Sequence, residues 1–341
     1  MDRQTSVVCI LAVAVMGLIG CNGNDSDVDA RSGSDEHLGQ ARRLVERDQL
    51  EAAMQQLEQA VVADPYNARA YTIMGDLYRH EGNLPAAKRS YERACKADPA
   101  AFRPCYNLGV VCQGLADLAG QAADAGDYLR QAVDAYIEAI TIKPASFEAN
   151  MNLGACYFRL GEYYRAEQYT RRATEINPTN HSAWNNLGVI SELQGRPEEA
   201  IAAYKNSIEL EVDQPNILLN LGSVYMRTGK LKLAMNVYQT ATRQSPQSAA
   251  PWQQMGVGYF RLGMFDKSIR SFQEAIRRDP RSPGAYRGFG VVCMYQAVLH
   301  PERTDLRQKA LKAWRVSLKL QPNQPDLAAL LERFDRQPAP K

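Results

Sequence analysis

The sequence lacks the residue clusters that enzymes and metal sites use. Its 341 residues include four histidines, which are scattered and form neither an HExxH pair nor a mixed Cys/His cluster. There is no G-x-S-x-G nucleophile motif, no P-loop, and no G-x-G-x-x-G after a predicted strand. Glycine pairs at Gly256/Gly258 and Gly288/Gly290 fall in segments that we predict to be helical, so we interpret them as packing glycines. We therefore predict no catalytic residue, no metal site and no cofactor.

The chain also has little net charge. The whole sequence carries +2, residues 1–21 are neutral and residues 22–36 carry −4, so residues 37–341 carry +6. Over so long a segment this charge is far below the dense basic surface of a nucleic-acid binder. We predict no nucleic-acid partner, and no motif indicates a small-molecule substrate.

What the chain does have is a proline that recurs at one spacing. Four of the six gaps in this series are 34 or 68 residues, and the other two, of 45 and 42, equal one period plus an insertion. The series is Pro65, Pro99, Pro144, Pro178, Pro246, Pro280 and Pro322. A fixed period of this size indicates stacked supersecondary units, none of which can bury its apolar face alone.

Glycine, small and aromatic residues fall in register within each period. One glycine column follows a large apolar residue: Gly75, Gly109, Gly154, Gly188, Gly222, Gly256 and Gly290. A second glycine marks a turn, where positive φ favours this residue. The later half has alanine or serine, an aromatic or apolar residue four positions on, and alanine or serine again after three, with Thr170 the exception at the aromatic position. Steps of three and four predict helices, so each unit is helix, glycine turn, helix and proline stop.

This pattern resembles the tetratricopeptide repeat (TPR). The resemblance implies an all-α, right-handed superhelical solenoid of about eight helix-turn-helix repeats over residues 34–324. The repeats are 34–67, 68–101, 102–146, 147–180, 181–214, 215–248, 249–282 and 283–324. The first is degenerate, with His37 and Gln40 at apolar positions, and the fifth has Val212 in place of its proline. Residues 325–335 predict a capping helix, followed by a tail at 336–341.

Repeats three and eight are longer than the rest. Eleven extra residues lie within 114–129 and eight around 298–306, in both cases at the turn between the two helices. Either they lengthen the helices or form a neutral loop, or they make a partner-specific contact at the edge of the solenoid.

The first 21 residues have a different character. After Arg3, residues 7–19 form an unbroken run of apolar and small side chains, too short to span a bilayer as a helix and typical of a signal peptide. The run ends in Leu18-Ile19-Gly20-Cys21, which resembles the bacterial lipobox, in which cleavage precedes the cysteine and lipid is attached to it. The resemblance implies a membrane anchor through lipid on Cys21 in the bacterial envelope. Asn22 after the cysteine is similar to lipoproteins sorted to the outer membrane, facing the periplasm, and residues 22–36 predict a disordered tether.

Five cysteines remain after such processing. Cys112 and Cys293 stand in a column where other repeats have tyrosine, so we predict that they are small buried hydrophobes. Cys105 and Cys112 are too far apart along a helix for a disulfide. Cys95 and Cys105 are placed to face each other across adjacent helices, and an oxidising periplasm makes their pairing an open question.

The TPR resemblance also implies a concave groove lined by the first helix of each repeat. Its sixth position carries successive carboxamides: Asn107, Asn152, Asn186, Asn220 and Gln254. Each offers a donor and an acceptor, so the row is able to pair with the backbone of an extended peptide. It is similar to the asparagine ladder of O-linked N-acetylglucosamine transferase. Asparagine is also the commonest residue there in TPR units, so the alternative is that the row reports only repeat consensus.

A strip of arginines accompanies the ladder. Arg159, Arg227 and Arg261 occupy the thirteenth position of their repeats, and the same alternative applies to them. The lysine and asparagine pattern with which TPR co-chaperones hold a C-terminal carboxylate is absent.

We therefore expect a non-enzymatic protein–protein interaction scaffold that binds a protein or an extended peptide. One hypothesis is an assembly factor for an envelope, type IV pilus or secretion complex, resembling pilotin-type TPR lipoproteins. The alternative is an adaptor that docks a periplasmic protease or peptidoglycan hydrolase to its substrates. Loss of an assembly factor changes the oligomeric state or location of the partner, whereas loss of an adaptor changes the lifetime of a substrate.

Overall fold

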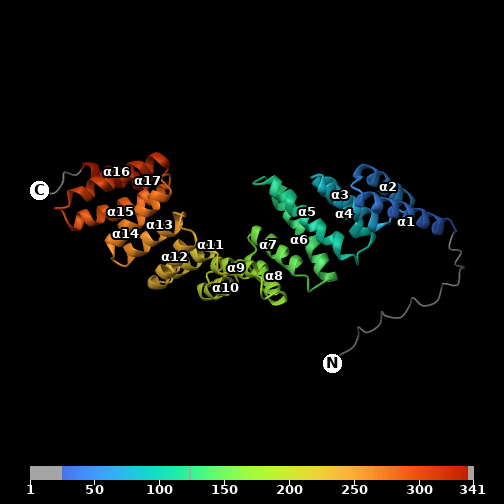
Figure 1. The fold of residues 1–341 in the computed structure, drawn as a ribbon, viewed down its shortest axis with the longest axis horizontal. Coiled ribbons are helices and arrows are strands. Elements are labelled where there is room, and N and C mark those ends of the chain that lie inside the picture. Colours follow the sequence, from blue (N-terminus) through green and yellow to red (C-terminus); the bar gives the residue numbers. More distant parts are fainter. Residues whose placement is uncertain (1–24, 123, 337–341) are drawn as a thin grey trace, which may run out of the picture. The chain divides into compact units, whose positions relative to one another are not determined.

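The computed structural model describes residues 25–122 and 124–336. Every regular element in these ranges is a helix, as the all-α prediction requires (Figure 1). In chain order they are α1 (Asp25–Glu46), α2 (Leu50–Ala63), α3 (Ala68–His80), α4 (Leu84–Ala97), α5 (Phe102–Ala119), α6 (Asp124–Ile142), α7 (Phe147–Arg159), α8 (Tyr163–Ile176), α9 (His181–Leu193), α10 (Pro197–Leu210), α11 (Pro215–Arg227), α12 (Leu231–Gln244), α13 (Ala250–Arg261), α14 (Phe265–Arg278), α15 (Pro283–Leu299), α16 (Thr304–Leu320) and α17 (Pro325–Arg336). The chain divides into two compact units, residues 1–115 and 116–341.

Each repeat is a pair of helices joined by a glycine turn. The turn glycines Gly82, Gly161, Gly195, Gly229 and Gly263 all have φ between 72° and 77°. A residue with a Cβ is strained in that left-handed conformation, which explains why the second glycine column exists. Side-chain caps start several helices, as where Asn67 accepts a hydrogen bond from the Ala70 amide at 3.0 Å.

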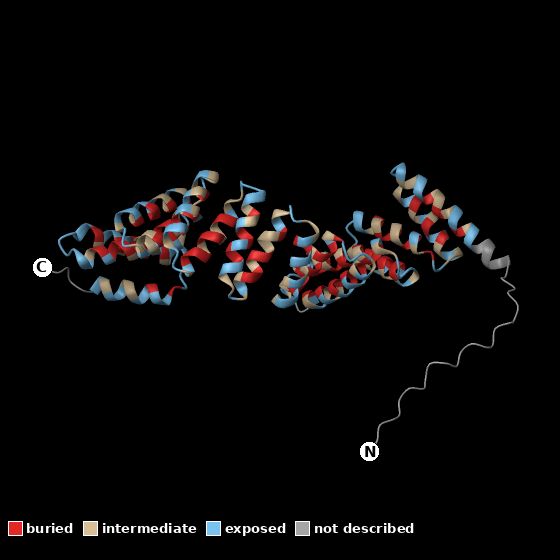
Figure 2. Cartoon of the chain, turned by 90° about the horizontal axis from the view of Figure 1, so that it is seen from below, coloured by how far each residue is buried: buried red, intermediate tan, exposed pale blue. Residues whose placement is uncertain are grey.

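The first glycine column is explained by packing against the aromatic column. A Cβ on Gly222 would lie 2.3 Å from the ring of Tyr238, and one on Gly188 would lie 2.6 Å from the ring of Tyr204. The glycine on the first helix therefore leaves the space that the ring on the second helix occupies, except at Gly154, which faces Thr170. These rings are fully buried, and Figure 2 shows buried residues on the facing sides of the helices. Close packing of this kind is the main source of stability for helices too short to persist alone.

The extra residues of repeats three and eight lengthen both helices of each pair. α5 and α6 have 18 and 19 residues, whereas the ordinary repeat has helices of 13 and 14, as in α7 and α8. α15 and α16 have 17 residues each. The longer helices expose apolar side chains to solvent: Leu118 is 76 % exposed and Val298 is 59 % exposed.

The structure differs from the sequence prediction at the start of the first repeat. α1 begins at Asp25, so residues 25–36 are helical where we expected a disordered tether. Packing explains the later part of this helix: Ser34 is buried and donates a hydrogen bond to the Ala60 carbonyl at 2.8 Å, and Leu38 is buried against the following helix. Once those turns are held, adding further turns to the helix costs little. The predicted signal peptide, Cys21 and tail residues 337–341 lie outside the described residues.

The C-terminal segment expected to cap the array forms α17. Its Leu327 is fully buried in a cluster with Trp314 and Leu306 of α16, and Arg315 pairs with Asp335 at 2.8 Å. Over residues 25–122 and 124–336, no helix combines the length and apolar character that a bilayer span requires.

Candidate peptide-binding face

The candidate site lies on the first helices of the repeats in the second unit. We call the exposed sides of α7, α9, α11, α13 and α15 the first-helix face. α9, α11, α13 and α15 are in contact in that order, so their side chains form one continuous surface. The predicted ladder residues from Asn152 to Gln254 and the three predicted arginines lie on these helices.

The ladder residues nearest the N-terminus are engaged inside the protein. Asn107, in the first unit, is 7 % exposed and its amide donates to Asp76 at 3.2 Å and to the Tyr91 hydroxyl at 3.4 Å. In the second unit, the Asn152 amide donates to the Tyr136 hydroxyl at 3.2 Å. In both cases the acceptor tyrosine stands 16 residues earlier, at the aromatic position of the preceding repeat. These two amides therefore link their helix to the preceding repeat.

The next three carboxamides have no such partner. Asn186, Asn220 and Gln254 are half-buried, and no side chain or backbone group in the described part of the chain bonds to their amides. The residue 16 positions earlier makes no hydrogen bond to the amide in any of the three cases. Thr170 is too short to reach Asn186, the Tyr204 hydroxyl donates to Glu192 at 3.0 Å, and the Tyr238 hydroxyl is buried without a partner. These three amides are therefore available to a ligand.

Thr170 also opens a cavity beside the ladder. It replaces the ring that other repeats place over the first glycine, here Gly154. The resulting cavity of about 120 Å³ is lined by apolar groups, including Phe158 and Val189, and by Asn186. An apolar recess next to an unused amide is suited to one small side chain of a bound segment.

The predicted arginines brace neighbouring first helices. Arg159 pairs with Asp117 at 2.8 Å and Arg227 with Glu192 at 2.9 Å, in each case an acid of the preceding first helix. Arg261 donates to the Met226 carbonyl at 2.7 Å, so at this contact its positive charge is not paired with a carboxylate. Salt bridges of this kind hold the face together and reduce its net positive charge at α7 and α11.

Tyrosines under the face are held protonated. Burial, followed by the charge of Glu192 and the hydrogen bond to it, raises the pKa of Tyr204 well above its usual range, and burial alone raises that of Tyr238. They act as hydrogen-bond donors and packing groups, not as acids, at physiological pH.

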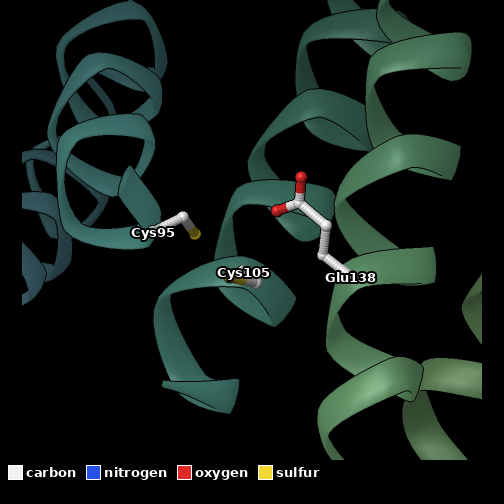
Figure 3. A group of neighbouring side chains, drawn as sticks. All are labelled: Cys95, Cys105 and Glu138. Carbon is white, nitrogen blue, oxygen red and sulfur yellow. The ribbon is translucent and has the colours of Figure 1, made fainter. Parts of the chain in front are cut away.

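The structure also shows where the cysteines lie. Cys112 and Cys293 are fully buried, and burial raises the pKa of their thiols to about 11 and about 12, which suits small hydrophobes. Cys95 of α4 and Cys105 of α5 place their sulfur atoms within 4.8 Å of each other, facing the space between the helices (Figure 3). The structure has both as thiols, 7 % and 1 % exposed, so no disulfide joins them.

Comparison with known proteins accords with this architecture. The family model described as the cilia and flagella-associated protein 70 C-terminal domain, a TPR domain, matches residues 35–220, more than half of the chain. Two models described as tetratricopeptide repeat match residues 193–255 and 249–282. The chain belongs to the tetratricopeptide repeat family.

Individual relatives are distant. The tetratricopeptide repeat-containing protein trd-1 of Caenorhabditis elegans is 24 % identical over 143 residues, which is 42 % of this chain and 17 % of trd-1. A crystal structure of MamA protein has a TM-score of 0.48 at 23 % identity, covering 53 % of this chain and 92 % of MamA. A structure of Pseudomonas aeruginosa pilF has a TM-score of 0.48 at 20 % identity, covering 64 % and 94 %. The chain thus spans under a fifth of the length of its curated relative trd-1.

Three features of the first-helix face were not predicted from the sequence. At Asn186, Thr170 takes the place of the tyrosine whose hydroxyl Asn107 and Asn152 use, and that exchange was visible in the sequence. The cavity beside Asn186 arises because Thr170 is smaller than an aromatic ring. The sequence showed Thr170 as the exception in the aromatic column, but we did not predict a cavity from it. Gly284 on α15 is the third feature, whereas Gly288 was interpreted as a packing glycine and does pack against Phe272.

Proposed function

We propose that this TPR chain is a non-enzymatic scaffold that binds an extended segment of a partner protein along its first-helix face. The supporting observation is the run of three half-buried carboxamides, Asn186, Asn220 and Gln254, without a partner in the described part of the chain. Each amide offers a donor and an acceptor, and a peptide backbone supplies the matching acceptor and donor. Backbone pairing also explains how one surface accepts a segment with little regard to its side chains.

Crosslinking in living cells tests this proposal. A photoreactive residue at position 186 is expected to capture one partner protein, and replacement of Asn220 by alanine is expected to weaken that capture. Each backbone-pairing amide contributes about 1 kcal/mol, or about fivefold in Kd. Asn107→Ala is the matched control, because its amide already bonds to Asp76 and Tyr91. Adducts that form only from a photoreactive residue at exposed position 118, on the lengthened α5, would overturn the proposal.

We further propose that the scaffold is held on the bacterial envelope, at the outer membrane facing the periplasm, by lipid on Cys21. The support is the apolar run and lipobox-like tetrad that precede Cys21 in the sequence. Cys21→Ser is expected to abolish incorporation of labelled palmitate and to release the chain from the membrane fraction. Retention of label by that variant would contradict the anchor.

Within that setting we propose a role in assembly of an envelope, type IV pilus or secretion complex, and the adaptor role for a protease or peptidoglycan hydrolase is the alternative. A surface that pairs with backbone along several repeats suits a partner that is held unassembled in extended form. Deletion of the gene followed by native gels and pulse-chase of the captured partner separates the two. A changed oligomeric state at constant lifetime supports assembly, and a changed lifetime supports the adaptor.

A further inference from the structure

The last repeat replaces the ladder amide with a hollow. At the sixth position, where the preceding repeats have carboxamides, α15 has Gly288, and one turn earlier it has Gly284. Residues four apart lie one above the other on the same side of a helix. The line on α15 that carries the sixth position therefore has no side chain at two successive turns.

A cavity of about 280 Å³ occupies this place. Its walls include Val257 and Phe260 of α13 and Val291 of α15, and its floor is the buried ring of Phe272. The Phe260 ring is held edge-on against Tyr295, with ring centroids 5.4 Å apart. The volume is at the lower limit of the roughly 300–1,000 Å³ typical of small-molecule pockets, so it suits one large side chain.

Internal packing accounts for only one of the two glycines. A Cβ on Gly288 would lie 2.3 Å from the Phe272 ring, so Phe272 requires glycine there. A Cβ on Gly284 would meet the end of the Gln253 side chain, with Nε2 at 2.9 Å and Oε1 at 3.4 Å. That side chain accepts one hydrogen bond, from Ser282 at 3.1 Å, and a shift of its flexible end would relieve the contact. The open mouth at Gly284 is therefore a feature that the fold itself does not demand.

Arg287 is the one charged side chain among the residues that line the cavity, since Asp266 and Glu274 of α14 are not part of the lining. α11, α13 and α15 contain no aspartate or glutamate, and each carries one arginine: Arg227, Arg261 and Arg287. Arg227 is neutralised by Glu192 of α9, and Arg261 bonds to a backbone carbonyl. Arg287 lines the cavity, is exposed, and has no acidic partner in the described part of the chain. Its guanidinium is thus available to a carboxylate of a ligand.

We propose that this cavity anchors an acidic segment of the partner protein, taking one large apolar side chain while a neighbouring carboxylate pairs with Arg287. The inference rests on the proposed function, in which an extended segment lies along the same face, and it adds the chemistry of that segment. A rigid apolar pocket next to an unpaired arginine is the arrangement that concentrates binding energy in few residues. The ladder then holds the backbone, and the cavity selects the sequence.

Selection from a library of random displayed peptides on the full chain tests the chemistry. Enriched peptides are expected to combine aspartate or glutamate with an adjacent leucine, isoleucine, phenylalanine or methionine. Arg287→Glu is expected to remove the preference for acidic residues and to weaken the best peptide about tenfold, a loss of about 1.4 kcal/mol. Arg281→Glu is the matched control, since Arg281 is exposed on the turn before α15 and does not line the cavity.

A second variant tests the cavity without touching the charge. Gly284→Leu fills the mouth and is expected to weaken the same peptide about tenfold or more, with the far-UV dichroism unchanged. If selected peptides lose affinity in an Asn186→Ala, Asn220→Ala double variant but are indifferent to Arg287→Glu and Gly284→Leu, the cavity proposal is wrong and the proposed function stands. If no peptide binds the face at all, both are wrong.

Discussion

At the scale of single residues, five repeats have a glycine that lies under an aromatic ring: Gly75, Gly188, Gly222, Gly256 and Gly290. The glycine has no Cβ, so the ring on the second helix comes closer to the first helix than any other residue would allow. This close contact stabilises a pair of helices that would be too short to be stable alone. It also means that the same substitution has opposite effects at different glycines.

We expect Gly222→Ala to destabilise the protein by about 1–3 kcal/mol, because the new methyl group would overlap the buried Tyr238 ring. Gly126→Ala is the matched control: it is also within a helix, but its Cβ would lie 3.7 Å from Arg130, so better helix propensity stabilises by up to about 1 kcal/mol. Urea unfolding of the two variants measures both effects. Equal effects would contradict the packing explanation.

The tyrosine column supports a second residue-scale prediction. Tyr204→Phe is expected to cost about 1–2 kcal/mol, because it removes a hydrogen bond to the charged Glu192. Tyr238→Phe is expected to be neutral or stabilising, because its hydroxyl is buried without a partner. The aromatic position already carries phenylalanine at Phe272, which shows that the ring alone suffices there. Thermal unfolding distinguishes the two, and a large loss in Tyr238→Phe would show that the hydroxyl has a partner.

At the scale of helices, charged groups join the second helices of adjacent repeats. Glu167 of α8 contacts Arg171 at 2.8 Å on its own helix and Arg196 at the start of α10. Burial acts to raise the pKa of Glu167, but the hydrogen bonds and charges of Arg196 and Arg171 outweigh it, so the pKa is held below its ordinary value. A carboxylate with a lowered pKa stabilises the fold above its ordinary pKa of about 4.5 and loses that contribution as the pH falls further.

We expect Glu167→Gln to lower stability at pH 7 by about 2 kcal/mol, through loss of charged hydrogen bonds. The difference from the wild type should shrink as the pH falls below about 4.5, because the unfolded chain is protonated first and the folded carboxylate follows at its lower pKa. Glu175→Gln is the control, because its pair with Arg172 is exposed and contributes little. A difference that stays constant from pH 7 to acid would argue against the ionic explanation.

The junction between α4 and α5 carries the other helix-scale prediction. Oxidised glutathione, acting by thiol–disulfide exchange, is expected to join Cys95 and Cys105, because their sulfur atoms lie within 4.8 Å. The protein should lose two hydrogens in mass and gain about 2–3 kcal/mol in stability. Cys105→Ser should abolish both changes, and Cys112→Ser should leave them intact. A disulfide found instead at the fully buried Cys112 or Cys293 would contradict this assignment.

At the scale of the whole molecule, an array of repeats is held together by contacts between neighbours. Stability is then a sum of local terms, and the last repeat needs a covering element. α17 supplies it, with Leu327 buried over Trp314 and Phe334 packed beside that ring at 6.1 Å between centroids. The charged outer side of α17 faces solvent in place of a further repeat.

We expect Leu327→Ala to cost about 2–4 kcal/mol in the last repeat, because it leaves a cavity in this cluster. Since coupling between repeats is local, Trp314 fluorescence, measured with Trp184 and Trp252 replaced by phenylalanine, should report unfolding at lower denaturant than far-UV dichroism does. Arg333→Ala, on the exposed side of α17, should leave both signals unchanged. Coincident shifts of both signals would indicate that the array unfolds as one unit.

The sequence by itself determined the repeat, its register and its turns. Its period, glycine columns and small-residue columns are local patterns, and local patterns suffice because each helix pair repeats the same short-range packing. The tertiary structure alone decided where α1 begins, since the buried Ser34 and Leu38 depend on α2. It also decided which ladder amides are free, because the bond from Asn152 to Tyr136 joins different repeats. The cavity at Gly284 and Gly288 was also decided by the tertiary structure. Side chains from several helices form its walls, so the sequence of one helix does not predict it.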